Sequence, residues 1–155
     1  MERFIIEGGH KLSGTLIPGG NKNEVLPALA ASLLTSEDVI LHNVPRIRDV
    51  EVMMNIIQDL GGEAEFIGDN DVRLCGAGVH KTELSPDLCR KVRASILFAG
   101  PMLARHREVH LPPPGGDVIG RRRLDTHFLA FQGLGASIDI GDCYHVKAKC
   151  LMGSD

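Results

Sequence analysis

Two stretches of the sequence occur twice in the same order, and this duplication restricts the possible folds more than any other feature. Leu60–Glu65 (LGGEAE) is similar to Leu134–Asp139 (LGASID), and Val39–Leu41 (VIL) is similar to Val109–Leu111 (VHL). A longer loop in the second copy, Pro112–Arg123, absorbs the difference in spacing. Repeated units whose apolar faces are too large to cover themselves bury those faces by stacking. We therefore predict an α/β fold made of two α-β-α-β-β units with their helices inward.

The period of the apolar residues predicts the elements of each unit. Leu26, Leu29 and Leu33 recur at helical spacing, whereas residues 63–67 alternate as a half-buried strand does. Asp49 is expected to cap the second helix, and the long crossovers favour some parallel strand pairing. The predicted helices span residues 22–34, 49–60, 88–103 and 125–134, and the predicted strands span residues 39–41, 63–67, 72–74, 108–111, 137–140 and 144–147.

The first twenty residues predict a separate element. Phe4–Glu7 and Leu12–Ile17 alternate apolar and polar side chains on either side of Gly8-Gly9, which indicates a small β-hairpin. Pro18–Asn21 then forms a loop that leads into the first helix. We therefore expect residues 1–20 to be one structural part and residues 21–155 to hold the repeated units.

The composition argues against several classes of function. The formal net charge is −3, and one Tyr, five Phe and no Trp leave few rings for base stacking, so nucleic-acid binding is not expected. The sequence has no apolar run of membrane-spanning length and no secretory signal, which favours a cytoplasmic protein without a membrane partner. Cys75, Cys89, Cys143 and Cys150 form no C-x-x-C pair, so we expect free thiols, no metal site and no cofactor.

Two predicted helix starts carry basic residues that can bind an anion. Lys22 follows Gly19-Gly20, where glycine permits close backbone approach and the free N–H groups of a helix attract negative charge. The alternative is an exposed turn with a solvated lysine. Arg93 leads into the apolar run Ile96–Ala99, and an arginine that enters a core needs a partner, either a structural carboxylate or a bound anion.

Residues 112–123 are expected to form a lid. Three prolines stiffen its approach, and glycines on both sides of Asp117–Ile119 allow the tip to hinge. A carboxylate at the tip, followed by Arg121–Arg123, can bring a proton donor or acceptor to an anionic substrate. The alternative is a surface loop with a solvated basic run. His127, on the next helix, is the histidine that we expect nearest to a site.

Several motifs occur along the chain in the order Lys22-Asn23, Asn43–Pro45, Asp49-Val50, Arg93–Ser95, and Pro114–Gly120 with Arg122 and Asp125. Taken together, these motifs resemble those of the UDP-N-acetylglucosamine enolpyruvyl transferases. The resemblance implies transfer of the enolpyruvyl group of phosphoenolpyruvate to the 3′-hydroxyl of UDP-N-acetylglucosamine, with release of phosphate. This reaction is the first committed step of peptidoglycan synthesis, on which cell shape and cell division depend. The implied fold is an inside-out α/β barrel with three such repeats in each of two domains.

The resemblance also implies roles for individual residues. Lys22, Arg93 and Arg122 match phosphoenolpyruvate-binding cations, and Lys22 is further expected to act in catalysis. Several converging cations suit a substrate that carries both a phosphate and a carboxylate. The residues expected to contact UDP-N-acetylglucosamine are Asn23, Arg93, Arg122, Arg123, Leu124, Asp125 and Thr126.

Asp117 departs from the pattern of most family members, which have cysteine at the tip of the lid, although a minority have aspartate. The resemblance implies that this residue is the general acid that protonates the methylene carbon of phosphoenolpyruvate. We expect desolvation on lid closure to keep its carboxyl group protonated at neutral pH. Fosfomycin alkylates the cysteine of relatives, so we expect fosfomycin resistance here, because a carboxylate is a poorer nucleophile toward the epoxide.

The chain is also shorter than members of this family. The resemblance implies that residues 1–20 are a hairpin belonging to the second domain of the full enzyme, and that residues 21–155 supply two of three repeats of the first domain. An aspartate general base and a further arginine then lie in the missing C-terminal half. The chain alone is therefore expected to hold about half of the site and to be inactive. Two alternatives stay open, the related shikimate-pathway enolpyruvyl transferase and a non-catalytic module that binds a nucleotide sugar.

Overall fold

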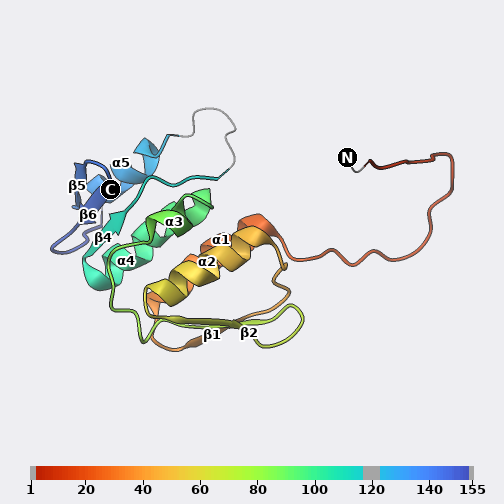
Figure 1. The fold of residues 1–155 in the computed structure, drawn as a ribbon, viewed down its shortest axis with the longest axis horizontal. Helices are drawn as coiled ribbons and strands as arrows, with labels where there is room; N and C mark the ends of the chain where they lie inside the picture. The colour runs from red at the N-terminus through yellow and green to blue at the C-terminus, as the bar shows by residue number, and fades with distance from the viewer. Residues whose placement is uncertain (1–2, 117–122, 154–155) are drawn as a thin grey trace.

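The computed structural model describes residues 3–116 and 123–153, and the chain forms two units, each with a helical region followed by a strand, a helix and two strands (Figure 1). The predicted α/β fold with a repeated α-β-α-β-β unit is confirmed. The first unit contains α1, the 3₁₀ turn η1, β1, α2, β2 and β3, which span Lys22–Ala31, Ser32–Leu34, Asp38–Leu41, Arg48–Asp59, Glu63–Phe66 and Val72–Cys75. The second contains α3, the 3₁₀ helix η2, α4, β4, α5, β5 and β6, which span Pro86–Cys89, Arg93–Phe98, Ala99–His106, Glu108–Leu111, Asp125–Gly133, Ser137–Ile140 and Tyr144–Lys147.

The three strands of each unit form one antiparallel sheet, and the two sheets have the same topology. Their strand orders are β1-β3-β2 and β4-β6-β5. β1 and β2 run in the same direction after the crossover through α2, but β3 returns between them and pairs antiparallel with both. The expectation of parallel pairing is therefore wrong for both sheets. In the described part of the chain, the structure records parallel pairing only as an isolated bridge between Glu83 and His110.

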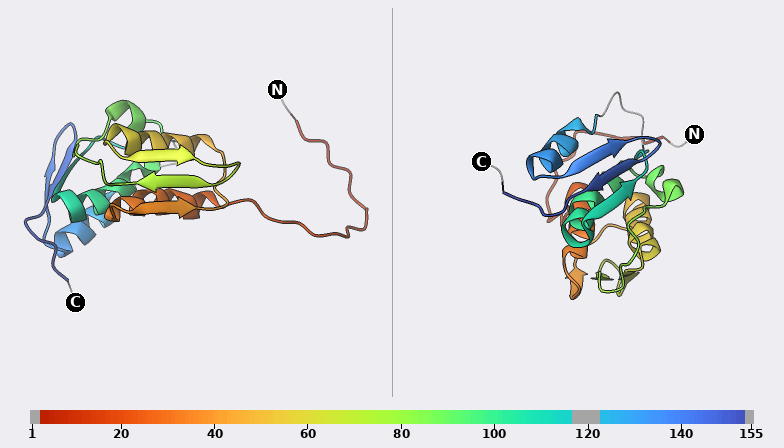
Figure 2. Two further views of the ribbon diagram at one scale, coloured as in Figure 1. Left: turned by 90° about the horizontal axis from the view of Figure 1, so that it is seen from below. Right: turned by 90° about the vertical axis from the view of Figure 1, so that its left-hand side faces the viewer.

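α1, α2, α3, η2 and α4 pack against one another on the inside, as predicted, and the sheets lie on the outside (Figure 2). The prediction is wrong for α5, which contacts β5 and has no buried residue. α1 contacts α2 and η2, while α4 contacts η1, η2 and β4. Leu29, Met53, Phe98 and Met102 are fully buried and come from four different helical segments, so one core serves both units. α2, with 12 residues, is the longest described helix, and none of those described has the length and apolar character needed to cross a bilayer.

The single helix predicted over residues 88–103 is wrong, because the chain leaves helical geometry after Cys89. The amide nitrogen of Gly115 donates to the Cys89 carbonyl at 2.9 Å, and that of Gly116 donates to the Arg90 carbonyl at 3.1 Å. These bonds take up the carbonyls that a continuous helix needs for its own ladder. A Cβ at Gly115 would lie 1.8 Å from the Arg90 oxygen, so this close approach requires glycine.

The hairpin predicted over residues 3–17 is not formed. Residues 3–20 contain no strand and extend away from the two units (Figure 1). Phe4, Ile6, Leu12 and Leu16 have relative exposures between 88% and 97%. A hairpin needs an apolar face that covers another surface to be stable, and residues 3–17 cover neither unit. That residues 1–20 belong to a second domain of a longer protein stays a prediction.

The four cysteines are free thiols, as expected from their spacing. Cys89 is buried in the core, and burial raises the pKa of its thiol to about 11. Because the thiolate is the reactive form, Cys89 is an inert packing residue at neutral pH.

Arg105 ties the second unit to the first. From α4, its Nη1 atom donates to the carbonyl oxygens of Leu33 at 2.8 Å, Thr35 at 3.1 Å and Gly76 at 3.2 Å. Two of these carbonyls lie where the first helical segment ends, so they lack partners within the helix, and the helix dipole favours a cation there. The guanidinium is partly buried, which shields the three bonds from water.

Replacing Arg105 with Met should therefore destabilise the fold while preserving side-chain length. We expect the free energy of unfolding to fall by about 2 kcal/mol, because partly buried carbonyls lose a charged donor. Urea denaturation measures this change. Arg90→Met is the matched control: Arg90 is 70% exposed and pairs only with the exposed Asp87 among the recorded ion pairs, so its loss should cost less than about 0.5 kcal/mol. Equal effects of the two substitutions would show that Arg105 does not hold the units together.

Candidate active site

The starts of α1, α2 and η2 surround a cavity of about 590 Å³. Because α1 packs against both α2 and η2, residues far apart in the sequence face one space. Its lining combines apolar and charged side chains. Its lining consists of Lys22, Asn23, Leu26, Arg48, Asp49, Lys91, Val92, Arg93, Ala94, Ile96, Leu97 and Gly116.

Each of the three helical segments contributes a cation from its first residue. These residues are Lys22 of α1, Arg48 of α2 and Arg93 of η2. A cation at a helix N-terminus is unfavourable, because the exposed N–H groups already give that end a partial positive charge. Three such residues around one cavity create a strongly positive site, which favours binding of an anion with more than one negative group.

Asp49 supplies a carboxylate to this cavity. Its Oδ2 atom pairs with Nζ of Lys22, which joins the starts of α1 and α2. Asp49 was expected to cap α2, but Ile47 occupies the N-cap position and Asp49 lies inside the first turn. Asp49 does not cap α2 because its side chain is engaged by a lysine of another helix. A bound anion would compete with Asp49 for Lys22.

Asn23 and Arg93 connect the cavity to their neighbouring elements. The N-cap of α1 is Asn21, whose Oδ1 atom accepts a hydrogen bond from the Asn23 amide at 2.7 Å, so the Asn23 side chain is not required for capping. Arg93 is partly buried, and its Nη2 atom lies 3.5 Å from the carbonyl oxygen of Arg123. Arg93 therefore lies between the cavity and the start of α5.

The sequence-predicted residues at the start of α5 do not line the cavity. Arg123 is 80% exposed and pairs with Asp125 at 2.6 Å. Leu124 is buried at the N-cap of α5, and Thr126 is exposed in its first turn. His127, which we expected nearest to a site, is also outside the cavity lining. The Arg123–Thr126 segment is thus linked to the cavity through Arg93.

Asp117 and Arg122 lie outside the described residues. Gly116, the last described residue before them, lines the cavity. Its φ is +91°, a conformation that favours glycine, and a Cβ there would lie 3.0 Å from the Arg93 backbone nitrogen.

Two further cations of the cavity were not expected there: Arg48 was not predicted as a site residue, and Lys91 was expected to face water. Arg48 had a usable signal, since it is a basic residue at the start of a helix, as Lys22 is. Lys91 follows Arg90 in an exposed turn, a pattern typical of a solvated surface. The packing of α2 against α1 brings Arg48 into one cavity with Lys22, and the packing of η2 against α1 does the same for Lys91.

The donor set of the cavity determines its chemistry. Lys22, Arg48, Lys91 and Arg93 face a single carboxylate, that of Asp49, among the described lining residues. A divalent cation needs several oxygen, nitrogen or sulfur ligands, which this set does not offer. The cavity instead suits a small polyanion, with Asn23 available for a neutral polar group.

Comparisons with known proteins show that the chain is similar in sequence to curated enzymes. It is 52% identical over 153 residues to a UDP-N-acetylglucosamine 1-carboxyvinyltransferase of Bradyrhizobium diazoefficiens, with 99% of this chain and 36% of that protein aligned. It is 50% identical over 155 residues to the protein of the same name from Treponema denticola, with 100% of this chain and 36% of that protein aligned. The chain thus spans about a third of the length of the curated relatives that it matches.

The fold and the family agree with these relatives. The crystal structure of the enolpyruvyl transferase NikO from Streptomyces tendae matches with a TM-score of 0.75 and 21% identity, covering 94% of this chain and 32% of that one, which supports the fold. Residues 6–150 match the family described as EPSP synthase (3-phosphoshikimate 1-carboxyvinyltransferase). On this match, which covers nearly the whole sequence, the chain belongs to the EPSP synthase family of enolpyruvyl transferases.

Proposed function

We propose that this chain supplies part of the active site of a UDP-N-acetylglucosamine enolpyruvyl transferase that acts in the cytoplasm on a step of peptidoglycan synthesis. The convergence of Lys22, Arg48 and Arg93 on one cavity is the observation that carries this proposal. Phosphoenolpyruvate has a phosphate and a carboxylate close together, and several cations are needed to hold both groups. The identity of about half of all residues to UDP-N-acetylglucosamine 1-carboxyvinyltransferases favours a sugar-nucleotide acceptor over shikimate 3-phosphate.

In the proposed complex, Lys22 and Arg93 bind phosphoenolpyruvate. Arg93 can offer two parallel N–H donors to a planar oxyanion, and Lys22 exchanges its pair with Asp49 for the ligand. Arg48 and Lys91 add positive charge at the wall. The four cations contribute to the rate mainly by positioning, because they hold the reacting carbon in line with the acceptor hydroxyl.

The acceptor is proposed to lie between the cavity and α5. Asn23 contacts the amino sugar, and the segment Arg123–Thr126, with Arg93 and Arg122, contacts the uridine nucleotide. The Arg93–Arg123 contact supports this arrangement, since it joins the two sets of residues.

Asp117 is proposed as the general acid. Its protonated carboxyl group gives a proton to the methylene carbon of phosphoenolpyruvate while the 3′-hydroxyl oxygen of the sugar bonds to the adjacent carbon. The hydroxyl proton goes to a base outside this sequence. In a second step phosphate leaves and the methyl carbon loses a proton, which restores the carbon–carbon double bond. Because the chain spans about a third of its relatives, we propose that the base and a further arginine come from the part of the protein that the chain lacks.

Phosphate release by a chimeric enzyme tests the proposed function. Residues 1–155 replace the matching third of the Bradyrhizobium diazoefficiens relative, to which they are 52% identical. We expect release of phosphate from phosphoenolpyruvate with UDP-N-acetylglucosamine and none with shikimate 3-phosphate. Activity only with shikimate 3-phosphate would overturn the proposed acceptor.

A variant pair in the chimera and a titration of the chain complete this test. Arg93→Met should raise the KM for phosphoenolpyruvate by roughly tenfold to a hundredfold, as expected for loss of a charge-assisted hydrogen bond, whereas Arg90→Met should leave it unchanged. Calorimetric titration of the 155-residue chain with UDP-N-acetylglucosamine should show negligible binding. Tight binding by the chain alone would favour a non-catalytic nucleotide-sugar module.

Fosfomycin sensitivity tests the role of Asp117. The chimera should keep its activity in fosfomycin and form no covalent adduct, because a carboxylate attacks the epoxide poorly. Asp117→Cys should make it sensitive and add the mass of one inhibitor molecule, since a thiolate is a strong nucleophile. Intact-mass spectrometry reads both results. An adduct on the enzyme with Asp117 would contradict the assignment.

A further inference from the structure

We propose that Glu108, His110 and His145 form a binding site for a divalent transition-metal ion, with Zn²⁺ as the best fit, on the outer face of the second sheet. The three residues come from two neighbouring strands, β4 and β6. His110 and His145 are directly opposite each other in the strand register. Glu108 lies two residues before His110, so both side chains are on the same face of β4.

This face points away from the core. Val109 and Leu111, which alternate with the proposed ligands along β4, are fully buried. The proposed site is therefore distinct from the cavity around Lys22 and Arg93, which is lined by helical segments and by Gly116.

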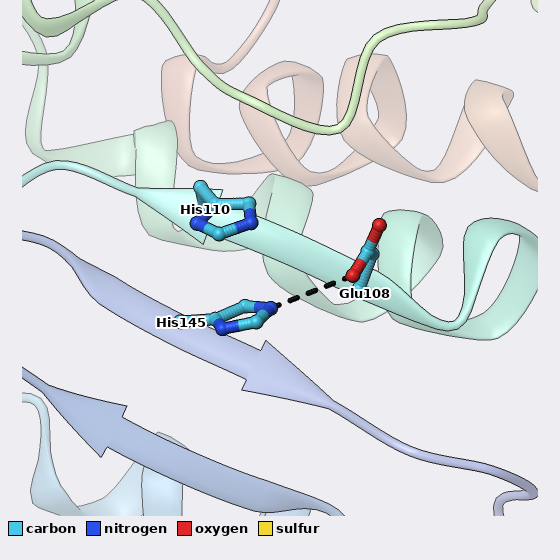
Figure 3. Close-up of side chains that lie close together, drawn as sticks. All are labelled: Glu108, His110 and His145. Carbon is cyan, nitrogen blue, oxygen red and sulfur yellow. Dashed lines mark ion pairs between the residues drawn. The ribbon is translucent and has the colours of Figure 1, made fainter.

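The three side chains already lie close enough to share one ion. One potential ligand atom from each residue lies within 4.8 Å of the other two. Nε2 of His145 is 3.5 Å from Oε2 of Glu108, and the two imidazole rings stack with centroids 3.9 Å apart and an interplanar angle of 14° (Figure 3). Small rotations of the rings out of this stack would aim a nitrogen from each at a common point.

His145 carries the strongest sign that a partner is needed. Its Nε2 atom is buried and makes no hydrogen bond within the described residues, although it lies 3.5 Å from Oε2 of Glu108. A buried polar atom without a partner is costly. On the other side of the ring, Oδ2 of Asp139 is 4.0 Å from Nδ1, beyond hydrogen-bond distance, and it accepts a hydrogen bond from Nζ of Lys147 at 3.0 Å.

The ligand types determine which ion fits. Two imidazoles and one carboxylate suit Zn²⁺, while Ca²⁺ and Mg²⁺ prefer oxygen ligands throughout. Three protein ligands leave a fourth position for water, which the half-exposed side chain of Glu108 permits. An ion held here would fasten β4 to β6 in addition to their ladder of hydrogen bonds.

Zn²⁺ binding by the 155-residue chain, measured by competition with a chromophoric chelator, tests this proposal. We expect one ion per chain, and at least tenfold weaker binding in His110→Ala and in His145→Ala. Co²⁺ in place of Zn²⁺ should give the visible absorption bands of a four-coordinate site. His42→Ala is the matched control, because His42 pairs with Asp71 at 3.1 Å but lies outside the three-ligand cluster. The affinity of this variant for Zn²⁺ should equal that of the unchanged chain. Equal affinity in the double variant His110→Ala/His145→Ala would overturn the proposal.

A second measurement needs no substitution. Diethylpyrocarbonate modifies free imidazole nitrogens, and peptide mass mapping reports each histidine separately. Zn²⁺ should slow the modification of His110 and His145 at least tenfold and leave His42 unaffected. Modification of His110 and His145 at the same rate with and without Zn²⁺ would show that the ion does not bind there.

Discussion

Both the core and the cavity depend on one interface, in which η2 packs against α1 and α4 packs against η1. It gives Phe98 and Met102 a place beside Leu29 in one buried cluster, and it brings Arg93 into the same space as Lys22. The guanidinium of Arg105 reinforces this contact by supplying a donor to carbonyls that would otherwise end a helix without partners. The stability of the fold and the geometry of the candidate site therefore share one interface.

The cations that line the cavity favour binding of an anion but lower the stability of the helices that carry them. Folding favours carboxylates at helix N-termini, yet the first residues of α1, α2 and η2 are all cations. Asp49 offsets part of this cost through its pair with Lys22. A ligand with two anionic groups would offset more of it, because its negative charges add to that of Asp49. The arrangement thus fits a protein whose cavity is completed by its substrate.

The parts of the fold that were predictable from sequence are those in which local pattern and final structure agree. The α-β-α-β-β repeat is visible because apolar residues recur at helical and strand periods in both copies. The break after Cys89 was not predictable, because it depends on hydrogen bonds from Gly115 and Gly116, a distant segment. The hairpin failed for the opposite reason: residues 3–17 alternate as strands do, but nothing covers them.

Some residues of the candidate site were likewise predictable from local sequence, and others were not. Lys22 and Arg93 had local signals, a glycine-rich approach and an entry into an apolar run, and the family resemblance strengthened them. Arg48 and Lys91 share the cavity only through tertiary packing. The roles of Asp117 and Arg122 rest on the sequence alone, since both lie outside the described residues.

A double-mutant cycle between Lys22 and Arg93 tests the central claim most directly, with phosphoenolpyruvate binding to the chimeric enzyme as the readout. If both cations hold one substrate molecule in one cavity, Lys22→Met and Arg93→Met should be non-additive, with a coupling free energy of about 1 kcal/mol or more. Losses that add to within about 0.3 kcal/mol would mean that the two residues act on separate sites, and would contradict the account.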